Sequence, residues 1–194
     1  MSFALETTED VSGASDQYLS EPGTYHCVVI GTAENEGPKG NPIDGFTATL
    51  AVLDGTTPGQ KDKEISLCLF SPDPSKEANS QKWARRKQQA FAIATELLSL
   101  QKKLGGSVKV ELSDAVGRQL VISFEKGEKY LQLAYDNIYH VDDPRAAKFP
   151  KDKEALGIIP KELRKQASYF DPVAKKPNTA KAAPRLSNSE LADL

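Results

Sequence analysis

The sequence predicts a mainly β domain of five strands, with one long helix between the third and the fourth strand. Two observations support this prediction. Short runs of alternating apolar and polar residues, rich in β-branched and aromatic side chains, recur through the middle of the chain. They are interrupted once, in residues 71–106, where the apolar positions follow a helical period.

Three strands are expected before the helix: GTYHCVVIGTAE (23–34), FTATLAVLDG (46–55) and EISLCLF (64–70). Alternate residues from Phe46 and from Ile65 form the inward faces of the second and third strands, which places Phe70 on an outward face. The connection between these two strands is too short for a crossover, so we expect them to pair in antiparallel fashion.

The helix follows two prolines that end the third strand. Ser75 or Asn79 is expected to cap it, its apolar positions run from Lys82 to Leu98, and Gly105-Gly106 ends it. Trp83 is expected to dock the helix on the strands.

Two more strands follow the helix, GRQLVISFE (117–125) and YLQLAYDNIYHV (130–141), joined by a tight KGEK turn. In the fourth strand Leu120, Ile122 and Phe124 are predicted to point inward, and Val121, Ser123 and Glu125 outward. Five strands with a helix between the third and fourth is the layout of an OB-fold barrel, and another small α+β fold is the alternative.

Charge divides the chain into parts. The formal net charge is −2, yet residues 1–21 carry five acids and no base, whereas residues 144–185 carry eleven bases and four acids. We therefore expect four segments: a flexible acidic N-terminal segment (1–21), the barrel domain (22–143), a partly structured basic extension (144–171) and a disordered tail with an acidic tip (172–194).

Residues suited to catalysis are few. The two histidines, His26 and His140, are expected to be surface or half-buried strand residues rather than a catalytic or metal-binding pair. Asp142-Asp143 precedes a proline and is expected to form a turn or a cap, with a metal-dependent nuclease as the alternative. We expect no enzyme, no cofactor and no metal.

The cysteines and the hydropathy pattern bear on the compartment. Cys27 and Cys68 lie in apolar alternating runs and are expected to be buried thiols, in a reducing cytoplasm. No apolar run approaches the ~20 residues that cross a bilayer, and the acidic N-terminus lacks the features of a secretory signal. We therefore expect a cytoplasmic protein without a membrane partner.

Bases near aromatic side chains are the candidates for function. A single-strand binder needs positive charge along the nucleic-acid backbone and rings on which bases stack. An OB barrel offers these from strands two and three and from the loops joining strands one to two and four to five. Phe70 and Tyr130 are out of phase with the aliphatic residues of their strands, so we predict that their rings face solvent. The predicted DNA-binding residues are Lys39, Lys61, Lys63, Phe70, Arg85, Arg86, Lys87, Lys126, Lys129 and Tyr130.

Three stretches resemble phage-encoded single-stranded DNA-binding proteins: residues 22–72, the basic helix KWARRKQQAFAIATELL and GRQLVISFEKGEKYLQLAYDNIYHVDD. The similarity covers about residues 22–143 and consists of short pieces, such as Gly23 and Tyr25 at the start of strand one and Asp54-Gly55 at the end of strand two. The resemblance implies an OB-fold protein that binds and protects single-stranded DNA, without sequence preference, during phage replication and recombination in a bacterial host.

The last residues, SELADL, resemble the acidic tips of such proteins. Glu190 and Asp193 supply charge, and Leu191 and Leu194 supply apolar anchors. The resemblance implies that replication or recombination proteins bind this tip. Two alternatives remain for the whole chain: a strand-annealing protein, or an OB-scaffold protein-interaction module that binds no nucleic acid.

Overall fold

The computed structural model describes residues 17–34, 45–98, 108–128 and 130–165. The predicted tail, 172–194, and the last residues of the extension lie outside these ranges. All five predicted strands are present, with boundaries within two residues of the prediction. The elements in chain order are β1 (Gly23–Glu34), β2 (Gly45–Gly55), β3 (Glu64–Phe70), α1 (Ala78–Ala94), η3 (Leu112–Ala115), β4 (Gln119–Lys126), β5 (Leu131–His140), η4 (Pro144–Ala146), α2 (Lys153–Gly157) and η5 (Lys161–Leu163).

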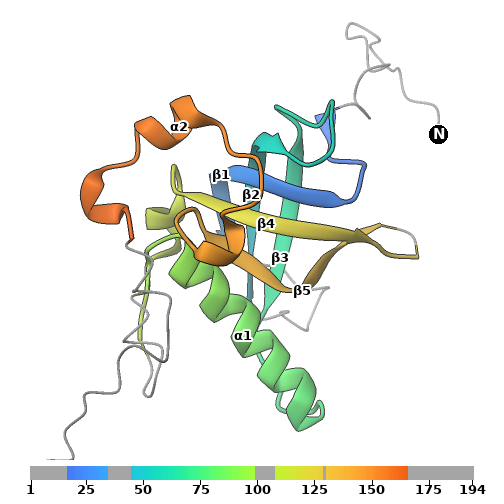
Figure 1. The fold of residues 1–194 in the computed structure, drawn as a ribbon. Helices are drawn as coiled ribbons and strands as arrows, with labels where there is room; N and C mark the ends of the chain where they lie inside the picture. The colour runs from blue at the N-terminus through green and yellow to red at the C-terminus, as the bar shows by residue number, and fades with distance from the viewer. Residues whose placement is uncertain (1–16, 35–44, 99–107, 129, 166–194) are drawn as a thin grey trace, which may run out of the picture.

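The strands form one antiparallel sheet in the order β3-β2-β1-β4-β5, which curls into a nearly closed barrel (Figure 1). β1 lies between β2 and β4 in the sheet. Its pairing with β4 begins at its first residue, and its pairing with β2 continues to its last. Its register shifts after His26 and after Val29, and bulges of this kind bend a strand. α1 packs against β3, β4 and β5. This is the architecture of an OB-fold barrel, as predicted.

The core follows the predicted alternation in β2 and β3. Phe46, Ala48, Leu50 and Val52 are buried in β2, and Leu67 and Leu69 are buried in β3. From α1, Phe91 inserts into this core with its ring centroid 5.4 Å from that of Phe46. Burial of such a ring contributes about 1.5–3 kcal/mol, so this contact fixes the helix on the barrel.

The predicted faces of β4 are confirmed, but most of its outward face is covered by other parts of the chain. Leu120, Ile122 and Phe124 point into the core, but Val121 and Ser123 are buried as well. Val121 packs with Val141 and Ala146 in a second, smaller apolar cluster. The chain that follows β5 covers this part of the barrel, so β4 is buried on both faces as far as Phe124, whereas Glu125 and Lys126 are exposed.

The predicted ends of the helix were also wrong. α1 begins at Ala78, and its N-cap residue is Glu77, which makes no side-chain capping bond. Ser75 instead binds Asp73, with its amide 2.8 Å from Asp73 Oδ1. The helix ends at Ala94 because Glu96 adopts a left-handed backbone conformation with φ of 64°. This conformation stops the helix before the predicted Gly105-Gly106.

Contacts with the barrel begin before residue 22. Tyr18 forms an isolated β-bridge with Glu64, and the Leu19 amide donates to the Glu64 carbonyl at 2.8 Å. The Leu19 side chain is buried in the main core. The end of the predicted flexible segment, 1–21, therefore packs along the start of β3.

Gly55 approaches the ring of Tyr25 too closely for any side chain. A Cβ at position 55 would lie 2.2 Å from Tyr25 Cδ1, and Tyr25 is fully buried. We expect Gly55→Ala to lower the free energy of unfolding by about 1–3 kcal/mol, measured by urea denaturation. Gly157→Ala is the matched control, because nothing lies within 4 Å of a Cβ there. Equal stability of the two variants would contradict this packing.

Candidate nucleic-acid interface

Two aromatic rings face solvent, as predicted. The Phe70 side chain, at the end of β3, is 48% exposed, and Tyr130, in the turn between β4 and β5, is 83% exposed. The turn is closed by a hydrogen bond from the Gly127 amide to the Tyr130 carbonyl, 3.1 Å long. A Cβ on Gly127 would lie 2.6 Å from that carbonyl oxygen, so only glycine fits there. A tight backbone turn therefore presents the Tyr130 ring.

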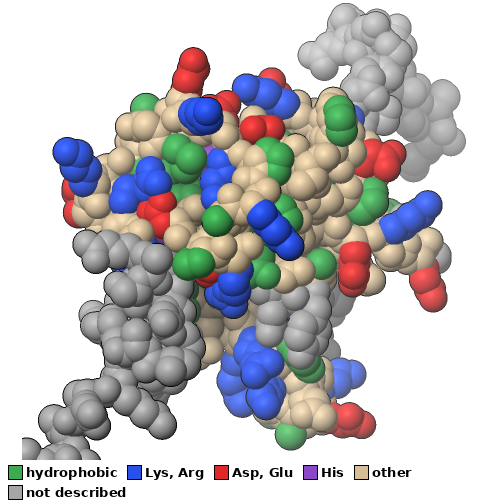
Figure 2. Space-filling model, in the orientation of Figure 1, with side chains coloured by type: hydrophobic (Ala, Val, Ile, Leu, Met, Phe, Trp, Pro, Cys, Tyr) green, Lys and Arg blue, Asp and Glu red, His purple; other side chains and the backbone are tan. Residues whose placement is uncertain are grey.

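α1 adds a block of positive charge. The helix carries four bases, Lys82, Arg85, Arg86 and Lys87, and no acid. Arg85 and Arg86 are exposed and Lys87 is half-buried. Figure 2 shows blue side chains gathered at the lower end of the helix. The Arg86 guanidinium carbon lies 5.3 Å from the centre of the half-buried Trp83 ring.

The basic helix is tied to the strand that carries Phe70. The side-chain nitrogen of Gln88, Nε2, lies 3.5 Å from the Leu69 carbonyl oxygen and 3.4 Å from Ser71 Oγ. These two residues flank Phe70 in the chain, and Lys87 is adjacent to Gln88. The structure thus brings the Phe70 ring and the bases of α1 to the same end of β3.

Lys61 and Lys63 lie at the other end of β3. Seven residues of β3 separate the two ends, a length of roughly 20 Å. Lys61 Nζ is 3.2 Å from Asp152 Oδ2, in the extension, and this hydrogen bond raises the lysine pKa. The structure therefore separates these two lysines from Phe70 and gives Lys61 an acidic partner.

The other predicted contacts are described only in part. Lys126 is exposed at the end of β4, on the same turn as Tyr130. Lys39, Lys129 and the four tip residues Glu190, Leu191, Asp193 and Leu194 lie outside the described residues.

Both histidines are buried, contrary to the prediction, and both hold the extension on the barrel. His26 Nδ1 accepts from the Asp152 amide at 3.1 Å, and its Nε2 lies 2.9 Å from Gln119 Oε1. Gln119 then donates to the Ala155 carbonyl at 2.7 Å. Because Nδ1 is an acceptor, Nε2 carries the proton and donates it to Gln119.

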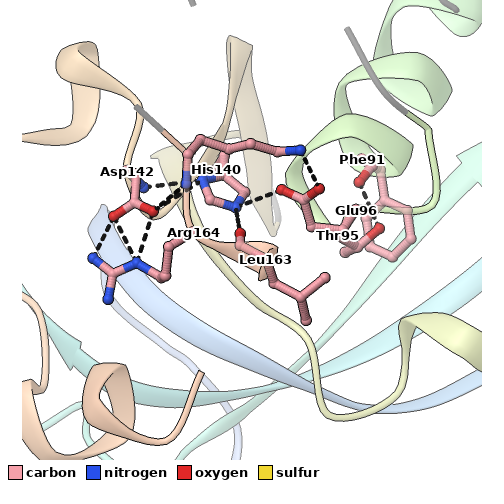
Figure 3. Close-up of polar contacts among 8 residues, drawn as sticks. Phe91, Thr95, Glu96, His140, Asp142, Leu163 and Arg164 are labelled. Carbon is pink, nitrogen blue, oxygen red and sulfur yellow. Dashed lines mark hydrogen bonds and ion pairs between the residues drawn. The ribbon is translucent and has the colours of Figure 1, made fainter. Parts of the chain in front are cut away.

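His140 joins the helix to the end of the extension (Figure 3). Its Nδ1 accepts from the Asp142 amide at 3.1 Å, and its Nε2 lies 2.7 Å from Glu96 Oε1 and 3.0 Å from the Leu163 carbonyl oxygen. Lys165 Nζ is 2.6 Å from Glu96 Oε2. Burial of the Glu96 carboxyl works to raise its pKa, but the hydrogen bonds from His140 and Lys165 outweigh burial and lower it.

The two aspartates after β5 hold the chain in place. Asp142 accepts from the Arg164 guanidinium, with Nε 2.7 Å from Oδ2, and from the Lys165 amide at 2.8 Å. Burial works to raise the Asp142 pKa, and these donors bring it below its ordinary value. Asp143 caps η4 by accepting from the Arg145 amide at 2.9 Å. The expectation of a turn or cap is confirmed.

The cysteines differ from each other. Cys27 is buried, as predicted, and burial raises the pKa of its thiol. The prediction for Cys68 was wrong: it lies on the outward face of β3 and is exposed. Both are free thiols. Among the described residues, no group of three or more His, Cys, Asp or Glu side chains could hold a metal ion.

Comparison of the chain with protein-family models and with curated proteins finds no match in either set. None of the helices within the described ranges is both long and apolar enough to span a bilayer. The arrangement can offer exposed rings beside cations, which is the chemistry that single-stranded nucleic acids require.

The burial of His26 predicts a pH-dependent stability. Burial lowers the pKa of His26, against smaller opposing effects of Gln119 and Asp152. Below a pH of about 6.5 the unfolded chain takes up a proton that the folded chain resists, so stability is full above that pH and falls as the pH drops towards the folded pKa. The slope should reach at most about 1.4 kcal/mol per pH unit.

Urea denaturation at pH 7.5 and 5.5 tests this, with His26→Gln as the comparison. The variant should lose less stability on acidification, because residue 26 no longer titrates. Glu96 and Asp142 have lowered pKa values and stay ionised over this range, and His140 is present in both proteins. An equal loss in both proteins would show that His26 does not carry the effect.

Proposed function

We propose that the chain is a non-enzymatic OB-fold protein that binds and protects single-stranded DNA without sequence preference. One observation carries the proposal: the exposed Phe70 ring lies at the end of β3 to which the acid-free basic helix is tied. Exposed rings accept bases of any identity, and cations follow the phosphates. Tyr130 and Lys126 offer the same combination on the turn between β4 and β5.

The position of these residues fits the way OB barrels bind nucleic acid. Such barrels use strands two and three and the loops that flank them. α1 is fixed on the barrel through Phe91, so its bases are presented from a fixed element beside β3. Sequence-tolerant binding of single strands is therefore the function that the geometry supports best.

The biological setting rests on the resemblance alone. The similarity of residues 22–143 to phage single-stranded DNA-binding proteins suggests a role in phage replication and recombination, in the cytoplasm of a bacterial host. Under the same proposal, the tip residues Glu190, Leu191, Asp193 and Leu194 bind a replication or recombination protein.

A gel shift with single-stranded DNA, the matching duplex and RNA of the same sequence tests the function directly. We expect the single strand to bind more tightly than the duplex, and different sequences to bind equally. Binding to neither DNA form would favour the interaction-module alternative. Faster pairing of complementary strands in the presence of the protein would favour the annealing alternative.

Tyr130→Ala should weaken single-strand binding by about 1–3 kcal/mol, because a stacked base loses its ring. Fluorescence anisotropy with a labelled oligothymidylate measures the loss. Tyr18→Ala is the matched control, since Tyr18 is 56% exposed and lies at the start of β3, away from Phe70. Equal losses in both variants, or none in a folded Tyr130→Ala protein, would remove Tyr130 from the interface.

Neutralising the helix should weaken binding through charge. We expect Arg85→Gln with Lys87→Gln to lower affinity equally for all sequences and to reduce the slope of log K against log salt by about 0.7 for each phosphate that the helix no longer neutralises. Lys153→Gln with Lys161→Gln, which removes two exposed bases from the extension, should leave the slope near wild type. If the helix substitutions leave the slope of log K against log salt unchanged, these bases are surface charges that contact no phosphate.

A further inference from the structure

A groove lies on the outer face of β4 and β5, against η4. It is open to solvent and has a volume of about 580 Å³. Strands, η4 and the chain just after η4 all contribute to its walls. The side chains that matter are those of Ser123, Asn137, Tyr139, Arg145, Lys148 and Phe149.

Two aromatic rings and two cations line this groove together. The Arg145 guanidinium carbon lies 4.9 Å from the centre of the Tyr139 ring, and Lys148 Nζ lies 5.2 Å from the centre of the Phe149 ring. Tyr139 and Phe149 are half-buried: they pack against the cluster around Val121 and also border the groove. The rings are therefore held from beneath by apolar packing.

The cations are held as well. Arg145 binds Asp143 through two contacts, Nε to Oδ1 at 3.0 Å and Nη2 to Oδ2 at 2.7 Å. Asp143 is only 2% exposed, whereas the Arg145 side chain is 69% exposed. The buried Asp143 carboxylate thus holds the Arg145 guanidinium in place at the wall of the groove. Lys148 is exposed.

The local charge favours an anion. Asp143 is satisfied by Arg145, and Asp142 by Arg164 and the Lys165 amide. Among the described residues that line the groove, two are bases and none is an acid, and because Asp143 balances the charge of Arg145, Lys148 supplies the positive charge. Figure 2 shows further Lys and Arg side chains over this face of the molecule, with Asp and Glu side chains among them. Rings with cations beside them match the requirements of a single strand more closely than those of a protein partner.

We infer that this groove, hereafter the β5 groove, binds a further segment of single-stranded nucleic acid, with bases against the two ring–cation pairs, Tyr139 with Arg145 and Phe149 with Lys148, and phosphates against Lys148. The inference rests on the proposed function. β5 begins directly after Tyr130 and runs to the groove, along a path shortened where its register with β4 shifts between Leu133 and Ile138 (Figure 1). A strand stacked on Tyr130 that follows β5 therefore reaches Tyr139.

Oligonucleotide length tests the inference. Affinity is measured for oligothymidylates of about 8 and about 30 nucleotides, lengths that bracket the span of an OB domain. We expect Lys148→Ala with Phe149→Leu to lower affinity for the long oligonucleotide about tenfold and to change that for the short one less than twofold. Leucine keeps the apolar packing of position 149. Lys153→Ala, an exposed lysine outside the groove, is the control and should bind both lengths like wild type.

Photo-crosslinking keeps the test decisive if the double variant unfolds early in a thermal melt. Wild-type protein is irradiated with a 30-nucleotide oligomer containing iodouridine, and the attached peptides are mapped. We expect attachment within residues 137–149. Attachment only elsewhere, or a folded double variant with wild-type affinity at both lengths, would overturn the inference and leave the proposed function standing. A wild-type protein that binds neither length would overturn both.

Discussion

The hydrogen bonds made by the two buried histidines fasten the basic extension to the barrel, and much of the molecule depends on them. His26 reaches Asp152 directly and Ala155 through Gln119, while His140 reaches Leu163 and Glu96. With the extension in place, β4 is covered on its outer face, which explains why Val121 is buried. The same docking sets η4 against β5 and brings Asp152 to Lys61. An imidazole suits this role because one nitrogen accepts while the other donates.

Glu96 links the end of α1 to this fastening. A left-handed conformation at a residue other than glycine is strained by about 1 kcal/mol or more, so the position needs compensation. Here the buried carboxylate meets His140 on one oxygen and Lys165 on the other. The residue that stops the helix also holds Lys165, the last described residue of the extension. The helix, the last strand and the extension are thereby joined, which fixes the direction in which the basic half of α1 projects.

The candidate interface shows how a nearly neutral chain can present positive surfaces. The formal net charge is −2, yet α1 has four bases and no acid, and the aspartates beside the β5 groove are bound to arginines. Backbone or core contacts place the residues that carry the rings: Phe70 by the pairing of β3 with β2, Tyr130 by the closed turn at Gly127, and Tyr139 by packing near Val121. Rigid presentation of rings lowers the entropy lost when a flexible strand is bound.

The sequence by itself determined the strand order, the inward faces of β2 and β3, and the exposure of Phe70 and Tyr130, because each follows from local alternation and short connections. Only the tertiary structure decided the rest. The burial of His26, His140 and Val121 depends on a segment far along the chain that returns to cover β4. The end of α1 at Ala94 depends on the buried partners of Glu96, and the separation of Lys61 from Phe70 depends on the length of β3. The β5 groove was not foreseen, because its rings and cations meet only when η4 folds back on β5. Local patterns specify the period and phase of an element, whereas contacts between distant segments are set by the packing of the whole chain.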